Sequence, residues 1–473
     1  ALSVQANAYA SHLRQTTING DASDLEPCGQ IGGLLCLGSE IATGAGGQPI
    51  RDFLHGGTYA QLNAAATDSA AFGAGLQALY KSAPLGGDNQ ILLGASYDAG
   101  RTAFRATSTV GAMTADRGFE GPGVVIDMPD GTIAPVDVAS DNDYVGLYAA
   151  DIFKPVAAAS ITVSARYNFS RIALRDRLGQ ALNGSHDYDR LNPAVGATYD
   201  VTEGSTLYAG YAEANRSPTP AEFSCADPKA PCSLTNFFVA DPNLKQVVSH
   251  TIEAGLRGRS ERFSWRAGYF HVDATDDILF AASSIAGRAF FENIGRTTRQ
   301  GIEASAEVRL GALQLSAGYV YTDAVFGQAI TLNSEDNPKA DANGQIHVVP
   351  GDRLPGIPAN TLSVSADYAF DRVWSVGLSG RYADGQFLRG DESNLNPKTR
   401  PYVVLDAYAR CRLSDRFELF ARIENLTDAK YETFGGFSPI DKVPIAEVPN
   451  ASNPRSLSPA PPLSAYAGVR VSL

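Results

Sequence analysis

The segment from Gly301 to Leu310 alternates apolar and polar positions without interruption. A period of two predicts a β-strand with one dry face and one wet face. The dry face of such a strand covers either the interior of a soluble protein or lipid. The apolar positions are Ile302, Ala304, Ala306, Val308 and Leu310, and the polar ones are Glu303, Ser305, Glu307 and Arg309.

The same alternation recurs along the chain and favours lipid. Dry faces are rich in alanine, with aromatic residues toward the strand ends, whereas the interior of a soluble sandwich needs bulky aliphatic residues. Wet faces carry Glu, Arg and Asp at mid-strand, which suits a watery lumen. The pattern therefore predicts an all-β protein, a transmembrane antiparallel β-barrel. The further segments are Leu313–Thr322, Leu362–Tyr368, Trp374–Tyr382, Phe417–Glu424 and Leu463–Leu473, with a weaker one at Ser3–Arg14.

Connection lengths alternate between short and long, as they do in outer-membrane barrels. Short links are predicted at Thr67–Ser69, Asp98–Arg101, Lys154–Pro155, Thr202–Gly204, Gly258–Glu261, Gly311, Asp371–Arg372 and Ser414–Arg416. Longer loops are predicted at Asn19–Gly56, Ala83–Asn89, Met113–Ser140, Asn168–Tyr188, Ser217–Gln246, Ala281–Gly287, Ala324–Ile357, Ala383–Arg400 and Ala429–Pro461. These links imply about 18 strands, within about two, with long loops outside the cell and short turns in the periplasm.

Composition narrows the partners. The chain has 473 residues and a formal net charge of −13, which argues against a nucleic-acid partner because such a partner needs clustered Lys and Arg. No apolar stretch reaches the ~18 residues of a membrane helix. No signal peptide is visible at the first residues.

The five cysteines divide into two local pairs and one single residue. Cys28 and Cys36 share the first long loop, and Cys225 and Cys232 share another, so we expect two disulfides formed in an oxidising compartment. A zinc site is disfavoured because the spacing and supporting histidines are absent. Cys411 falls on a dry face and is expected to be a free, lipid-facing thiol.

Candidates for catalysis or metal binding have simpler interpretations. Ser185–Asp189 could suggest a hydrolase pair but has no recognisable oxyanion-hole partner. Met128–Asp143 holds several Asp residues that could bind calcium, yet it lacks the spacing of an EF-hand loop, so a solvated acidic loop is favoured. The six histidines are scattered. We therefore expect no enzymatic activity, no metal site and no cofactor.

Several segments resemble, in order, those of TonB-dependent outer-membrane receptors: "NRSPTPAEF", "DPNLKQVVSHTIEAGLRG", "FFENIGRTTRQGIEASAEVRL" and "LFARIENLTDAKYETFGGF". The resemblance covers about the last half to two-thirds of the chain. It implies a 22-stranded barrel with an N-terminal plug domain, in the outer membrane of a Gram-negative bacterium. It also implies import of a scarce solute (siderophore-iron, cobalamin, haem or oligosaccharide), driven through the TonB complex of the inner membrane.

No plug-like segment or TonB box is recognisable, and the strand count falls about four short of the family's. We therefore expect residues 1–473 to form barrel alone, with plug and first strands outside this chain. The strand at Ser3–Arg14 should then not pair with Leu463–Leu473. A direct ladder between them would favour the alternative, a passive porin of about 16 to 18 strands.

The expected partners are the TonB complex, a small solute and outer-membrane lipid or lipopolysaccharide. Aromatic residues and arginines near the bases of the long loops are the candidates for solute contact. The alternative is that they pack the loops together or belong to the aromatic girdle. These candidates are Arg216, Phe237, Phe238, Phe387, Arg389, Phe434 and Phe437.

Overall fold

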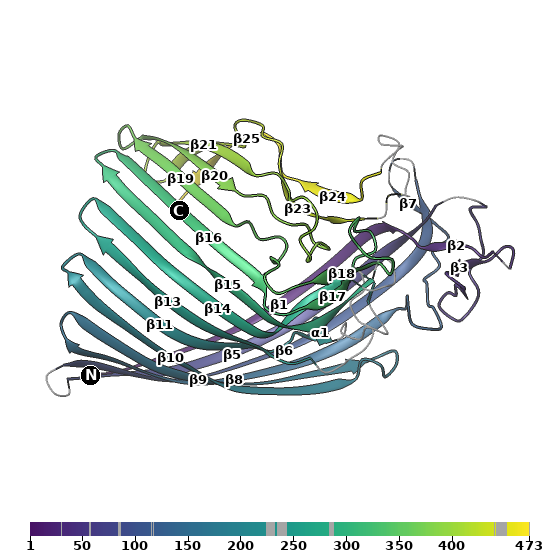
Figure 1. Cartoon of the computed structure of the whole chain (residues 1–473), viewed down its shortest axis with the longest axis horizontal. Coiled ribbons are helices and arrows are strands. Elements are labelled where there is room, and N and C mark those ends of the chain that lie inside the picture. The colour runs from purple at the N-terminus through teal and green to yellow at the C-terminus, as the bar shows by residue number, and fades with distance from the viewer. Residues whose placement is uncertain are drawn as a thin grey trace.

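The computed structural model describes residues 1–472 except 30, 56–57, 84–86, 115, 117, 224–231, 234–243, 283–287, 439 and 441–451. Within these residues a single antiparallel sheet contains 20 strands (Figure 1). Its strands of eight or more residues form the wall of the barrel. They are β1 (Leu2–Ala22), β5 (Tyr59–Ser82), β6 (Asp88–Met113), β8 (Val136–Val156), β9 (Ala159–Asp176), β10 (Gly184–Thr202), β11 (Ser205–Arg216), β13 (Val247–Arg259), β14 (Phe263–Ala282), β15 (Arg288–Leu310), β16 (Leu313–Phe326), β19 (Asn360–Ala369), β20 (Trp374–Ala383), β21 (Tyr402–Arg412), β22 (Phe417–Glu424) and β25 (Ser464–Val471).

The remaining elements are short and lie in the loops. Four belong to the large sheet: β7 (Phe119–Glu120), β12 (Cys232–Ser233), β17 (Ile330–Asn333) and β18 (Gln345–Val348). Others form two small sheets: β2 (Leu25–Pro27) with β3 (Leu35–Leu37) and β4 (Glu40–Ile41), and β23 (Glu432–Phe437) with β24 (Arg455–Pro459). The helix α1 spans Pro220–Phe223. In the part of the chain that the structure describes, no helix has the length and apolarity needed to cross a membrane.

The wall strands pair in chain order. β1 pairs with β5, β5 with β6, and each later wall strand with the next, as far as β22 with β25. Among the described residues no ladder joins β1 to β25, so these two strands are the edges of the wall. This agrees with the expected opening between the first and last strands.

Short turns lie at one end of the wall and long loops at the other, with both termini at the turn end (Figure 1). Two predicted links were wrong, because Thr67–Ser69 lies inside β5 and Asp98–Arg101 inside β6. Ala83–Asn89 is a connection at the turn end, not a long loop. The cause is that β5 and β6 are 24 and 26 residues long, far more than the ~9–11 needed to cross a bilayer. Their outward faces become polar beyond the membrane, which breaks the alternation.

The dry face predicted for Gly301–Leu310 points outward. Ile302 lies opposite Tyr269 on β14 and Tyr321 on β16, and their exposed fractions are 50%, 45% and 37%. A continuous band of exposed large apolar residues across neighbouring strands is unusual for a soluble surface and fits contact with lipid. The prediction of a transmembrane barrel is therefore confirmed.

On the inward face, aromatic side chains lie flat over glycines of neighbouring strands. A Cβ atom at Gly255 or at Gly268 would stand 2.5 Å from the Tyr208 hydroxyl oxygen. The same arrangement places Tyr148 over Gly94, Tyr408 over Gly377 and Phe420 over Gly468. These glycines are needed because any larger side chain would displace the ring above it.

The first long loop has a core of its own. Leu25 and Leu35 pack there with Tyr59 at the start of β5 and with Val110 near the end of β6. The predicted disulfide between Cys28 and Cys36 is confirmed, with Cα atoms 5.1 Å apart. It closes a small ring next to this core and restricts the unfolded loop.

The other cysteine predictions have different outcomes. Cys225 lies outside the described residues, so its pairing with Cys232 stays a prediction. Cys411 is free, as expected, and its register with exposed residues of the neighbouring strands places it on the outward face, but only 5% of the residue is exposed, so it is covered rather than in contact with lipid. Its cross-strand neighbours on β20 and β22 are Trp374 and Leu419, both far larger than a cysteine.

We expect Gly255→Val to destabilise the barrel by about 1–3 kcal/mol, because the added side chain meets both the Tyr208 ring and the Ala267 carbonyl oxygen. The measurement is the urea midpoint of the folded form, detected by its gel mobility without boiling. Gly196→Ala is the control, since a Cβ there would meet only the Ala209 oxygen, at 3.6 Å. An unchanged midpoint for Gly255→Val would contradict the packing described above.

Candidate functional site

Most of the predicted contact residues lie at the loop end of the wall. Phe387 and Arg389 belong to the loop between β20 and β21, and Phe434 and Phe437 belong to β23. Arg216 is the last residue of β11. Phe237 and Phe238 lie outside the described residues.

Arg389 joins three segments of the chain. Its guanidinium carbon is 4.9 Å from the centroid of the Phe280 ring on β14, and its Nη2 donates a hydrogen bond to the Phe280 carbonyl oxygen at 3.1 Å. Its backbone N–H donates to the carbonyl oxygen of Gly435 on β23 at 3.0 Å. A cation above an aromatic face is attracted by the ring quadrupole and still presents N–H groups to solvent. Arg389 thus becomes an exposed, positioned cation.

Phe280 was missed by sequence reasoning, although it is central to this cluster. Its ring centroid is 4.6 Å from that of Phe291 on β15. Both lie at the loop ends of long strands, in "DDILF" and "AFFEN", where an aromatic residue is equally expected for a girdle. Only the fold brings Phe280 to Arg389, because the two are 109 residues apart in the chain.

The same loop carries a second cation over a ring. Nζ of Lys398 lies 4.7 Å from the centroid of Phe387, and the Phe387 carbonyl oxygen accepts the backbone N–H of Gly356. Phe434 is 51% exposed. The structure thus places two exposed cations, each on a phenyl ring, and one exposed phenyl ring at the loop end.

Arg216 supports the alternative interpretation, in which a candidate packs the loops. Its Nη1 donates to the Glu222 carboxylate at 2.7 Å, and the same carboxylate accepts the backbone N–H of Thr219. The Thr219 hydroxyl in turn accepts the backbone N–H of Glu222. This reciprocal pair is a capping box for α1. Arg216 therefore fixes the start of the loop after β11.

A buried acidic turn follows Arg389. Asp391 is fully buried, and its carboxylate accepts the backbone N–H groups of Leu395 and Asn396. Glu392 is 7% exposed, and its Oε1 accepts the backbone N–H of Gly390. Burial raises the pKa of both carboxyl groups. In the described residues neither carboxylate forms an ion pair, so the neutral form of Glu392 suits this turn.

The wall itself contains a gap in its backbone ladder. The β10–β11 ladder ends at the pair Ala194–Ala212, although β10 stays paired to β9 as far as Gly184 and β11 to β13 as far as Arg216. Pro193, the next residue of β10, has no backbone N–H to donate. Beyond it the two strands are joined by side chains, and we call this region the β10–β11 seam.

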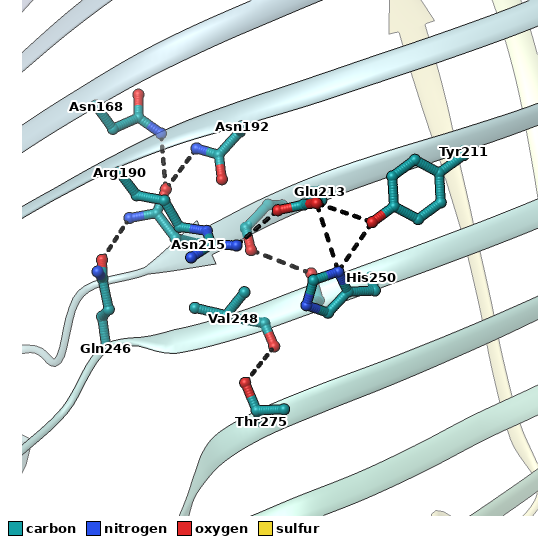
Figure 2. Close-up of polar contacts among 12 residues, drawn as sticks. Asn168, Arg190, Asn192, Tyr211, Glu213, Asn215, Gln246, Val248, His250 and Thr275 are labelled. Atoms are coloured by element: carbon teal, nitrogen blue, oxygen red, sulfur yellow. Dashed lines mark hydrogen bonds and ion pairs between the residues drawn. The ribbon is translucent and has the colours of Figure 1, made fainter.

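Asn215 is the centre of the seam (Figure 2). Its Oδ1 accepts hydrogen bonds from Nδ2 of Asn168 at 2.9 Å and from Nδ2 of Asn192 at 2.7 Å. Its Nδ2 donates to Oε1 of Gln246 at 2.8 Å, and Nε2 of Gln246 donates to the Asp189 carbonyl oxygen at 3.1 Å. One amide side chain thus ties four strands or loop segments together.

Charged groups cross the seam beside this amide. Nη2 of Arg190 donates to Oε2 of Glu213 at 2.6 Å, and Oε1 of Glu213 accepts the Tyr211 hydroxyl at 2.8 Å. The same hydroxyl lies 3.0 Å from Nδ1 of His250 (Figure 2). The ion pair is partly buried, with exposed side-chain fractions of 27% and 17%. Removing either partner would leave the other charge partly buried and unpaired, which is unfavourable.

We expect Asn215→Ala to destabilise the barrel by about 1–3 kcal/mol, because Asn168, Asn192 and Gln246 would each lose a hydrogen-bond partner in a partly buried site. Thr198→Ala is the control, since Thr198 lies on the same strand within the regular ladder. The measurement is again the urea midpoint of the folded form. Equal midpoints for the two variants would show that the seam contributes nothing.

The acidic turn gives a pH prediction. A raised pKa means that the folded turn binds its proton more tightly than the unfolded loop does. Its stability is therefore complete at low pH and falls as pH rises above the ordinary range of a carboxyl group. Glu392→Gln should reduce this fall, leaving the smaller part that Asp391 contributes. Hydrogen exchange across residues 384–401, corrected for the intrinsic rate, measures it. Asp341 is a control in which the pH dependence has the opposite sign. Backbone N–H groups lower its pKa, so its contribution to the stability of its own loop is lost on acidification. Wild-type exchange in 384–401 that slows with rising pH would refute the assignment.

Known proteins with similar sequences are barrel-forming receptors. Residues 4–426 match the family model described as TonB dependent receptor-like, beta-barrel. The probable TonB-dependent siderophore receptor PiuA of Acinetobacter baumannii is 25% identical over 259 residues, covering 54% of this chain and 32% of the relative.

Solved structures agree in fold. The siderophore receptor PiuA from Acinetobacter baumannii superposes with a TM-score of 0.62 at 15% identity, covering 88% of this chain and 61% of that one. BauA, the ferric preacinetobactin receptor of the same organism, gives a TM-score of 0.59 at 15% identity, covering 98% and 60%. The chain spans about a third of the curated relative and about three-fifths of these structures. Because the family model matches nearly all of the wall, the chain belongs to the TonB-dependent receptor β-barrel family.

Proposed function

We propose that this chain forms the barrel of an outer-membrane receptor that binds a ferric siderophore at its loops and imports it. Membership of the receptor family supports this proposal, as does the relative named as a siderophore receptor. The energy for import would come from the TonB complex, contacted through a plug segment that is not recognisable in this chain. Proteins of this family are receptors and transporters, so the proposal includes no catalytic step.

The observation that carries the choice of ligand is the pair of ring-supported cations. Arg389 on Phe280 and Lys398 on Phe387 come from one loop, and Phe434 lies exposed on β23. A siderophore wraps iron in anionic oxygen donors on an organic frame. Exposed N–H donors would bind the oxygens and a phenyl face would cover the frame.

The passive porin is the second candidate. The number of wall strands is the observation in its favour. Family membership favours the receptor. The two differ in behaviour, because a porin passes solutes without saturation and without energy.

The test uses a panel of radiolabelled ferric siderophores on cells that express the protein. We expect one of them to bind saturably in de-energised cells and to enter only when TonB is present. Arg389→Ala and Lys398→Ala should each weaken binding by about tenfold, equivalent to about 1.4 kcal/mol. The control is Arg372→Ala, in the turn at the opposite end of the wall.

The panel also decides between the two candidates. Uptake that is unsaturable and independent of TonB would contradict the receptor and support the porin. Saturable binding that neither Arg389→Ala nor Lys398→Ala changes would keep the receptor and reject this loop cluster as its site.

A further inference from the structure

A line of outward-facing tyrosines marks the loop-side border of the apolar band. Their hydroxyl groups bond to polar residues farther toward the loops: Tyr97 to Asp143 at 2.5 Å, Tyr167 to Asp189 at 3.3 Å, and Tyr319 to Asn360 at 2.6 Å. Amphipathic aromatic rings of this kind lie at the level where the hydrocarbon of a membrane meets its headgroups. The outward residues just beyond them therefore face lipid headgroups.

Beyond Tyr97 the outward face of β6 changes from apolar to basic. Arg101 and Arg105 follow Tyr97 at even spacing, so they share its outward face. Between them lies Ala103, which pairs with Asp68 on β5, and Asp68 pairs with Arg14 on β1. Strands are about 5 Å apart and alternate residues about 7 Å apart. Arg14, Arg101 and Arg105 thus form one patch, which we call the arginine triad.

Each arginine of the triad is held from beneath by an aspartate. In every case Nε is the donor: Arg14 to Asp68 at 2.8 Å, Arg101 to Asp141 at 2.6 Å, and Arg105 to Asp137 at 2.9 Å. Among the described residues the Nη1 and Nη2 groups of these arginines have no hydrogen-bond acceptor. An arginine anchored at Nε directs its paired Nη groups away from the anchor.

The arginines are also the outer members of these pairs. The exposed side-chain fractions of arginine and aspartate are 77% and 51% for Arg14–Asp68, 75% and 44% for Arg101–Asp141, and 68% and 20% for Arg105–Asp137. The outermost groups are therefore cationic, although the whole chain carries a net charge of −13. Each arginine is matched by an aspartate, so the patch has no excess of positive charge; it presents the cationic member of each pair outward.

We propose that the arginine triad binds the phosphate groups of anionic glycolipid headgroups in the outer leaflet. The two outward Nη groups of a guanidinium match two phosphate oxygens, and the aspartates pre-orient the guanidinium so that less side-chain entropy is lost. Arg101 and Arg105 lie about 13 and 26 Å beyond Tyr97 along the tilted strand, so the patch extends outward from the tyrosine border through the region of the lipid headgroups. The proposal rests on the transmembrane wall and does not depend on the solute that the loops bind.

The test measures lipid binding to the full chain by native mass spectrometry from phosphatidylcholine nanodiscs. One set of nanodiscs contains bis-phosphorylated lipid A, and a matched set contains the dephosphorylated lipid. We expect wild-type protein to retain the phosphorylated lipid and the triple variant R14Q/R101Q/R105Q to retain about tenfold less. The control R262Q/R372Q/R416Q has the same change of charge in turns at the opposite end and should match wild type.

Three further arms make the result decisive. Gel mobility without boiling shows that each variant is folded. The variant R14K/R101K/R105K keeps the positive charges but loses the paired donors of the guanidinium, so its lipid retention should fall between that of wild type and that of the Gln variant. Equal retention by wild type and the folded Gln variant would overturn the proposal. So would equal retention of dephosphorylated lipid, or displacement of the lipid by inorganic phosphate at constant ionic strength, which would indicate a site for the free ion.

Discussion

Every backbone N–H and C=O group that crosses lipid must be bonded within the protein, because hydrocarbon offers neither donors nor acceptors. Between consecutive strands the wall meets this constraint through antiparallel ladders, whereas the outer edges of β1 and β25 have no ladder among the described residues. The gap between β10 and β11 is informative. The β10–β11 seam begins beyond Ala194 and Ala212, next to Tyr211, whose hydroxyl bonds to Glu213. Between β10 and β11, backbone pairing thus ends at the border of the apolar band, and hydrogen bonds of the Asn215 and Gln246 side chains join the strands beyond it.

The alternation of apolar and polar residues predicted the wall because each strand has one face in lipid and the other in the lumen. Ile302 and its neighbours must be apolar to face lipid, and Glu303 must be polar to face the lumen. The pattern failed where the constraint ends. Asp68 and Arg101 face outward beyond the membrane, so polar residues stand at positions that should be apolar, and β5 and β6 appeared to stop at Thr67–Ser69 and Asp98–Arg101. The role of Pro193 could not be predicted from the sequence alone. It depends on the pairing of β10, which at this residue is bonded to β9 but not to β11.

The residues of the candidate loop site could be predicted from the sequence, but their arrangement could not. The sequence singled out Phe387, Arg389, Phe434 and Phe437, and the structure gathers them at the loop end. Their positions depend on contacts over long sequence distances, such as Arg389 with Phe280. Arg216 matched the same criteria and has a structural role instead, because an arginine at a loop base serves a helix cap as well as it serves a ligand.

The account depends on which face of the wall meets lipid, and this can be measured along the segment Gly301–Leu310. Nitroxide spin labels placed singly at positions 301 to 310, in protein reconstituted in a bilayer, report collisions with oxygen, which enriches in lipid, and with a water-soluble nickel chelate. We predict oxygen accessibility to peak at Ile302, Ala304, Ala306 and Val308, and nickel accessibility to peak at Glu303, Ser305 and Glu307. A profile without this period of two, or one with the two sets exchanged, would contradict a wall whose dry face meets lipid.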